Sequence, residues 1–116
     1  MVPEPKEKRN RLNPGEKANL SSLVEYQPGS VVSRTIVESK AGTVRIFAFG
    51  EGEGLSEHTS PQDALVFILD GEAAVTIAGK ESLLMQSEGI ILPAGKPHSL
   101  YAPKRFKMLL TMIRPS

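Results

Sequence analysis

The residues best suited to chemistry in this sequence are two histidines. His58 and His98 are the only histidines among the 116 residues. A neutral imidazole can donate and accept hydrogen bonds, can carry a proton near neutral pH and can ligate a metal ion. The two side chains therefore predict a polar site, provided that the fold brings them together.

Other familiar catalytic devices are absent from the sequence. The chain has no cysteine, which excludes disulfides, thiolate metal sites and a cysteine nucleophile. The glycine-rich stretch 50–54 does not lead into Lys-Ser/Thr at the start of a helix, and its glutamates would repel phosphate. No serine lies in a nucleophile elbow with a histidine partner, so acyl transfer has no support.

The segments that must position the histidines are short and rich in β-branched, aromatic and aliphatic residues. Sets of turn-forming residues, such as 40–42, 70–72 and 93–95, separate them. No sustained helical period follows residue 30, so an all-β sandwich or closed barrel is predicted. The predicted strands span residues 31–38, 43–49, 64–69, 73–78, 82–86, 89–92, 99–102 and 106–113.

The length of the chain predicts one domain with one apolar core. Residues 3–11 are charged and nearly without apolar side chains, which predicts a solvated arm. Leu20, Leu23 and Val24 fall at helical spacing and predict a short helix or turn. We therefore divide the chain into 1–19, a polar N-terminal arm with the start of that helix or turn, and 20–116, a single barrel domain.

Two stretches around the histidines fit a pair of known motifs. The first motif runs Gly, five residues, His-x-His, three or four residues, Glu, six residues, Gly. The second runs Gly, five residues, Pro-x-Gly, two residues, His, three residues, Asn. The residues that match are Gly52, His58, Gly71, Pro93, Gly95 and His98.

On these motifs, residues 43–113 resemble the cupins, and the chain is similar to a small single-domain cupin. The resemblance implies a double-stranded β-helix, also described as a jelly-roll barrel. In metal-binding cupins three histidines and a glutamate hold one transition-metal ion inside the barrel. Ser60 and Ala64 stand here in place of the second histidine and the glutamate, so only His58 and His98 remain. A catalytic metal site normally has about three protein ligands, and the resemblance therefore implies no metal, or a divalent transition metal at partial occupancy.

Three nearby side chains could complete such a site. Asp63 is next to Ala64, but adjacent residues of a regular strand face opposite sides, so only a bulge would turn its carboxylate inward. Gln62 and Glu57 are further candidates near the barrel mouth, and both residue types more often lie on the surface.

Apolar residues could line a pocket around the histidines, or could simply fill the core of a small barrel. Arg45 lies on the same strand face as Phe47 and Phe49, where it is either a rim cation suited to a carboxylate ligand or a solvated charge. The predicted pocket comprises His58, Ser60, His98, Gln62, Phe47, Phe49 and Met108.

Apolar residues occupy both faces of the last predicted strand, with Met108 and Met112 on one side and Leu109 and Ile113 on the other. A single barrel cannot bury both, so a homodimer is expected. The net charge of +1 predicts no nucleic-acid partner. No apolar run is long enough to cross a bilayer, so no membrane association and a cytoplasmic location are expected.

Three classes of function remain open on the sequence. The first is a small-molecule-binding module that holds a modest organic acid around His58 and His98 without a tightly bound metal. The second is a metal-dependent enzyme of the oxygenase, isomerase or sugar-modifying type, in which Asp63, Gln62 or Glu57 completes the site. The third is a scaffold that uses the barrel only as a stable body.

Overall fold

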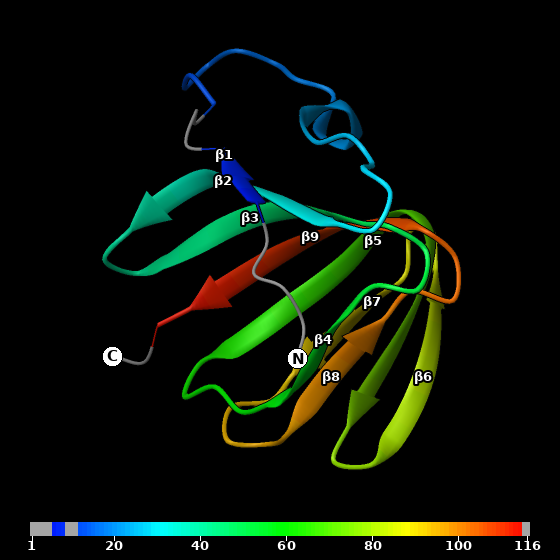
Figure 1. The fold of residues 1–116 in the computed structure, drawn as a ribbon. Coiled ribbons are helices and arrows are strands. Elements are labelled where there is room, and N and C mark those ends of the chain that lie inside the picture. Colours follow the sequence, from blue (N-terminus) through cyan, green and yellow to red (C-terminus); the bar gives the residue numbers. More distant parts are fainter. Residues whose placement is uncertain (1–5, 9–11, 115–116) are drawn as a thin grey trace.

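The protein is described by a computed structural model that covers residues 6–8 and 12–114. Within these residues the strands follow the order β1-β2-β3-β9-β5-β8-β4 in one curled sheet, and β6 and β7 also pair with β5 (Figure 1). All pairs are antiparallel except β1 with β2. The elements are β1 (Lys6–Lys8), the 3-10 helix η1 (Leu20–Leu23), β2 (Val31–Ser39), β3 (Gly42–Phe49), β4 (Gly54–His58), β5 (Asp63–Ile77), β6 (Lys80–Met85), β7 (Gly89–Leu92), β8 (His98–Tyr101) and β9 (Phe106–Ile113).

Strand β5 connects the two halves of the barrel. Its first half pairs with β7 and β9, and its second half pairs with β6 and β8. The prediction of two strands, 64–69 and 73–78, with a turn between them is therefore wrong. Gly71 has a φ of +81°, and the register with β9 shifts between Ile68 and Asp70. The extra residue of this bulge is Leu69, and together with the positive φ of the nearby Gly71 it bends one long strand instead of reversing the chain.

Two strands lie outside the predicted set. β4 carries His58 and pairs with β8, although its sequence has a single large apolar residue, Leu55. β1 falls inside the predicted solvated arm and pairs with the edge of β2. The other residues of that predicted arm, 3–5 and 9–11, lie outside the described residues.

The apolar core fills the space between the two halves of the barrel. Its members come mostly from alternate, inward-facing positions along the strands, as period-two side-chain direction requires. Phe49 stacks on Phe106 with ring centroids 4.4 Å apart. The buried members are Val31, Phe47, Phe49, Ala64, Val66, Ile68, Ala73, Val75, Leu84, Leu92, Leu100, Ala102, Phe106 and Met108.

A second cluster lies on the outer face of β2, β3 and β9, beneath the segment that precedes β2. Helix η1 lies over this face (Figure 1), and its terminal Leu20 and Leu23 pack against the cluster with Val24. The predicted short helix or turn is thus a single 3-10 turn. Within the described ranges, none of the helical structure is long and apolar enough to cross a bilayer.

Candidate functional site

His58 and His98 meet at the wall of one half of the barrel. They are direct cross-strand partners on β4 and β8, and their Nε2 atoms lie 3.2 Å apart. The rings meet edge to face, with centroids 4.4 Å apart and planes at 68°. His98 is buried, with 4% of its surface exposed, whereas His58 lies at the exposed end of its strand. The histidine pair therefore has one ring in the barrel wall and one ring toward solvent.

The backbone around each histidine fixes the direction of its ring. Nδ1 of His58 is 2.8 Å from the carbonyl oxygen of Ser56, and Nδ1 of His98 is 3.2 Å from that of Lys96. The amide of Gly95 also donates to the carbonyl of Ser60 at 2.8 Å, which joins the loops that follow β4 and precede β8. Because both Nδ1 atoms face backbone acceptors, both Nε2 atoms are turned toward each other.

Three contacts in the histidine pair each require one proton. They are the two contacts between Nδ1 and a carbonyl and the contact between the Nε2 atoms. Two neutral imidazoles carry only two protons in total, so a neutral pair leaves two lone pairs facing each other in one contact. One additional proton satisfies all three contacts. The hydrogen bonds of the pair would therefore be complete with one proton more than two neutral rings carry.

A second positive charge on the pair is disfavoured. Burial, and then the charge of neighbouring His58, lowers the pKa of His98 below its ordinary value of 6.5. Both causes act against the charged form of His98, the first through desolvation and the second through repulsion. His98 is consequently the ring of the pair that resists protonation.

A small apolar cavity of about 70 Å³ adjoins the histidine pair. The predicted pocket residues Ser60 and Met108 contribute to its wall, and so does Ala64. Sequence reasoning missed Leu55, Leu92, Leu100 and Leu110; of these, Leu55 could not be found because β4 itself was not predicted. The complete lining is Leu55, His58, Ser60, Ala64, Leu92, His98, Leu100, Met108, Leu110 and Met112.

The other predicted pocket residues lie outside this lining. Phe47 and Phe49 pack in the barrel core, where their rings stack on each other with centroids 5.9 Å apart. Gln62 donates its backbone amide to Oγ of Ser60 at 3.1 Å. Arg45 is on the inner sheet face, as predicted, and donates to Oγ of Ser33 at 2.9 Å. Its guanidinium lies 4.9 Å from the Phe47 ring centroid.

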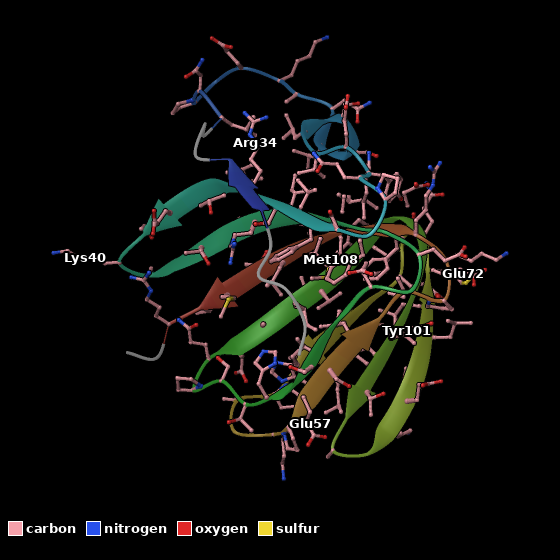
Figure 2. The ribbon with its side chains drawn as sticks, viewed as in Figure 1. Arg34, Lys40, Glu57, Glu72, Tyr101 and Met108 are labelled. Atoms are coloured by element: carbon pink, nitrogen blue, oxygen red, sulfur yellow. The ribbon has the colours of Figure 1, made fainter. Side chains whose placement is uncertain are left out.

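The carboxylates proposed to complete a metal site point elsewhere. Asp63 is exposed, and its Oδ1 accepts the backbone amide of Ala94 at 2.8 Å. No bulge re-aims it, since the register shift of β5 with β9 comes between Ile68 and Asp70. Glu57 is exposed at the lower margin of the molecule (Figure 2). Asp63 therefore stabilises the turn before β8 and adds no ligand to the histidine pair.

Comparison with known proteins agrees with this architecture. A family model described as a cupin domain matches residues 45–113, which is more than half of the chain. The chain belongs to the cupin family. No match is found among the curated proteins.

Several solved structures share this fold. A conserved protein of unknown function from Streptococcus pyogenes is 33% identical, with 92% of this chain and 94% of that chain covered and a TM-score of 0.87. A cupin superfamily protein from Desulfitobacterium hafniense is 30% identical over 91% of this chain and 97% of that one, with a TM-score of 0.85. A cupin 2 conserved barrel domain protein from Leptotrichia buccalis is 39% identical over 84% of this chain, which spans about half (47%) of that protein, with a TM-score of 0.81.

The donor atoms present do not fit the metal centre of metal-binding cupins. Among the residues that the structure describes, no three His, Cys, Asp or Glu side chains gather closely enough to hold an ion. Two Nε2 atoms at 3.2 Å leave a metal with only two imidazole ligands, one fewer than the roughly three of a catalytic site. Ala64 offers no donor where the resemblance places a glutamate. This cupin site is thus an imidazole pair beside an apolar cavity.

Proposed function

We propose that this cupin binds a small organic acid, with its carboxylate on the histidine pair and its short apolar part in the adjoining cavity. The observation that carries the proposal is the placement of His58 and His98 at the wall of a cavity otherwise lined mainly by Leu, Ala and Met. A ligand carboxylate could take the place of one imidazole as the acceptor of the Nε2 proton, and with a charged imidazole this is a charge-assisted hydrogen bond. No carboxylate of the described residues gathers there to compensate the charge.

The size of the cavity limits the ligand. About 70 Å³ is well below the usual range of drug-sized pockets, which begins at about 300 Å³. A ligand that fits without rearrangement therefore has only a few carbon atoms, as acetate, propionate and butyrate do. Because the wall is apolar apart from the imidazoles and Ser60, a short alkyl chain is preferred to a hydroxylated one.

Calorimetric titration of the full chain with propionate tests this proposal, with propionamide as the uncharged analogue. We expect propionate to bind and propionamide to bind at least about tenfold more weakly, because only the carboxylate complements the charged pair. His58→Gln, at an exposed position, should weaken propionate binding by a similar factor. Ala64→Leu should abolish it by filling the cavity, and Lys80→Gln on the distant β5–β6 hairpin should leave it unchanged.

Equal affinities for propionate and propionamide would overturn the proposal, as would unchanged binding to Ala64→Leu. The competing assignment is a metal-dependent enzyme. It would be supported if the protein purified without chelators retained about one equivalent of transition metal that His58→Ala removes. If no small acid and no metal binds, the scaffold assignment is favoured.

We further propose that the protein is a homodimer whose contact is the part of the outer face of β2, β3, β9, β5 and β7 that η1 and the segment before β2 leave exposed. Five residues are direct cross-strand partners in succession across these strands, so their side chains share that face. They form a row across the face: Val37, Val44, Thr111, Leu65 and Ile91. Ile113 lies two residues from Thr111 and extends the apolar surface, and it is exposed together with Val37, Leu65 and Ile91.

A second copy of the chain suits this surface. The row is apolar at four of its five positions, and the formal net charge of +1 sets up little repulsion between two copies. An extended apolar surface on a sheet is a common site of association, and a two-fold axis lets one row cover the other.

A further inference from the structure

A second and larger cleft lies away from the histidine pair, where the segment before β2 meets the loops after β3 and β8. Its volume is about 410 Å³, within the usual range of about 300–1,000 Å³ for small-molecule pockets. The lining contains one cation, one carboxylate, two ring side chains and backbone. Its residues are Tyr26, Gln27, Pro28, Gly29, Gly50, Glu51 and Arg105.

The cation of this cleft is held in place without a carboxylate partner. The guanidinium of Arg105 lies 4.3 Å from the centroid of the Tyr26 ring. Of the described carboxylates, none is within ion-pair distance of Arg105. Contact with the ring restrains the guanidinium, whose N–H groups match a carboxylate in bidentate geometry.

Tyr26 is itself fixed, which pre-organises the arginine. Its hydroxyl donates to Oδ2 of Asp70 at 2.6 Å, and Nζ of Lys107 lies 5.0 Å from its ring centroid. Burial, and then the hydrogen bond to Asp70, raises the pKa of Tyr26 above its ordinary value of 10, so the hydroxyl keeps its proton and remains a donor. A cation fixed before binding loses less side-chain entropy when a ligand arrives.

The backbone wall of the cleft is also rigid. The amide of Ser30 donates to the carbonyl of Gln27 across the Pro28-Gly29 turn, and the amide of Gly50 donates to the carbonyl of Ser30. A Cβ on Gly50 would lie 3.2 Å from the Gln27 oxygen, so the two segments touch through backbone alone. The cleft is therefore a formed feature of the fold and needs no ligand to assemble it.

Glu51 determines which anion suits this cleft. It is exposed on the same lining as Arg105 and makes no hydrogen bond or ion pair with the described residues. Its carboxylate would repel a simple anion but would attract a ligand that also carries an ammonium group. The rings of Tyr26 and Pro28 provide apolar surface for the rest of such a ligand.

We propose that this cleft binds a free α-amino acid with an apolar side chain, through its carboxylate on Arg105 and its ammonium group on Glu51. Both charges of the ligand are then neutralised by charges already present in the lining. The site is independent of the histidine pair, which binds in the barrel interior. Either site can therefore fail its test without affecting the other.

Nuclear magnetic resonance titration of the ¹⁵N-labelled full chain with L-leucine tests the proposal. N-acetyl-L-leucine lacks the ammonium charge and L-leucinamide lacks the carboxylate. We expect L-leucine to shift the amide resonances of Gly29 and Gly50, and each single-charge analogue to bind at least about tenfold more weakly. Arg105→Gln and Glu51→Gln should each cause a loss of similar size for L-leucine.

Combining a cleft variant with a single-charge analogue tests which ligand charge each residue binds. Arg105→Gln should bind L-leucinamide no more weakly than the unmodified protein does, since the contact that this analogue lacks is already removed. Lys80→Gln and Glu81→Gln remove matched charges on the distant β6 hairpin and should not alter binding. The proposal is overturned if L-leucine shifts no cleft resonance, if all three compounds bind alike, or if both cleft variants retain full affinity.

Discussion

Ser60 and Ala64 determine whether the histidine pair can hold a metal, because both line the cavity beside it. The double variant Ser60→His with Ala64→Glu would place an imidazole and a carboxylate at that wall. With four donors in place, we expect it to retain about one equivalent of a divalent transition metal through dialysis. Elemental analysis of the purified variant and parent measures the difference.

The matched control for this gain of metal is Ser60→His with Ala64→Gln. Glutamine has nearly the size of glutamate but no charge, so metal retention should fall well below that of the glutamate variant. If the parent protein retained as much metal as the double variant, the assignment of a metal-free pair would be wrong.

At His98, stability should depend on pH. Its pKa is lowered in the native protein by burial and by His58, so the unfolded chain binds this proton more readily. The stability that the native protein gains by keeping His98 neutral is therefore complete above the ordinary pKa of 6.5. It is lost as the pH falls through that value toward the lowered native pKa. Urea unfolding between about pH 7 and pH 5 should show a shallower loss for His98→Gln than for the parent. Parallel curves for the two proteins would refute this linkage.

At the scale of the element, the pairing of β5 with the start of β9 requires a glycine two residues after the bulge. Gly71 has a φ of +81°, and a Cβ there would overlap the carbonyl oxygen of Arg105 and press on Phe106. Gly71→Ala should therefore lower the free energy of unfolding by at least about 3 kcal/mol, because a positive φ and a backbone clash act together. Urea denaturation measures this loss.

Gly79 provides the matched control for the Gly71 substitution. It has a φ of +83°, but a Cβ there would meet no atom within 4 Å. Gly79→Ala should therefore cost only the conformational term, about 1 to 2 kcal/mol. Equal losses at the two positions would show that contact with the Arg105 carbonyl contributes nothing.

The strands and turns that carry the site differ in how well the sequence predicts them. Gly71 lies beside the bulge of β5, and Pro93 and Gly95 lie in the turn before β8, so motif spacing predicted the barrel and its two histidine positions. It could not predict β4, whose outward polar residues carry no strand pattern, or the direction of the rings. The ring direction depends on a register shift between Leu55 and His58 and on two backbone carbonyls, which leave no signature in residue type.

Asp63 is a further residue whose role could not be predicted from the sequence. Its position next to Ala64 made it a plausible ligand, and only tertiary structure reveals that its carboxylate accepts the Ala94 amide. Likewise, the cleft at Arg105 and Tyr26 joins residues far apart in sequence, with no motif between them. Local sequence patterns therefore predicted the barrel. The hydrogen-bond partners of its polar side chains could be assigned only from the three-dimensional structure.

At the scale of the whole molecule, the apolar row on the outer sheet face leads to a prediction of the oligomeric state. The proposed dimer would cover Leu65 and Ile91, which are direct partners on β5 and β7. Ile91→Glu would bury two unpaired carboxylates across a two-fold axis, and such burial is strongly unfavourable. We expect the parent chain to have twice the mass of a single chain in light scattering at roughly 50 µM, and Ile91→Glu to be a monomer.

Leu83→Glu is the control that separates a specific contact from general surface polarity. Leu83 is 55% exposed and Ile91 is 61% exposed, so the two substitutions add the same charge at similarly accessible apolar positions. Leu83 lies on β6, which is not part of the proposed contact face. If the row is the interface, Leu83→Glu remains dimeric while Ile91→Glu dissociates. A monomeric parent would exclude the homodimer. Dissociation by Leu83→Glu but not by Ile91→Glu would instead assign the contact to the sheet half that contains β6.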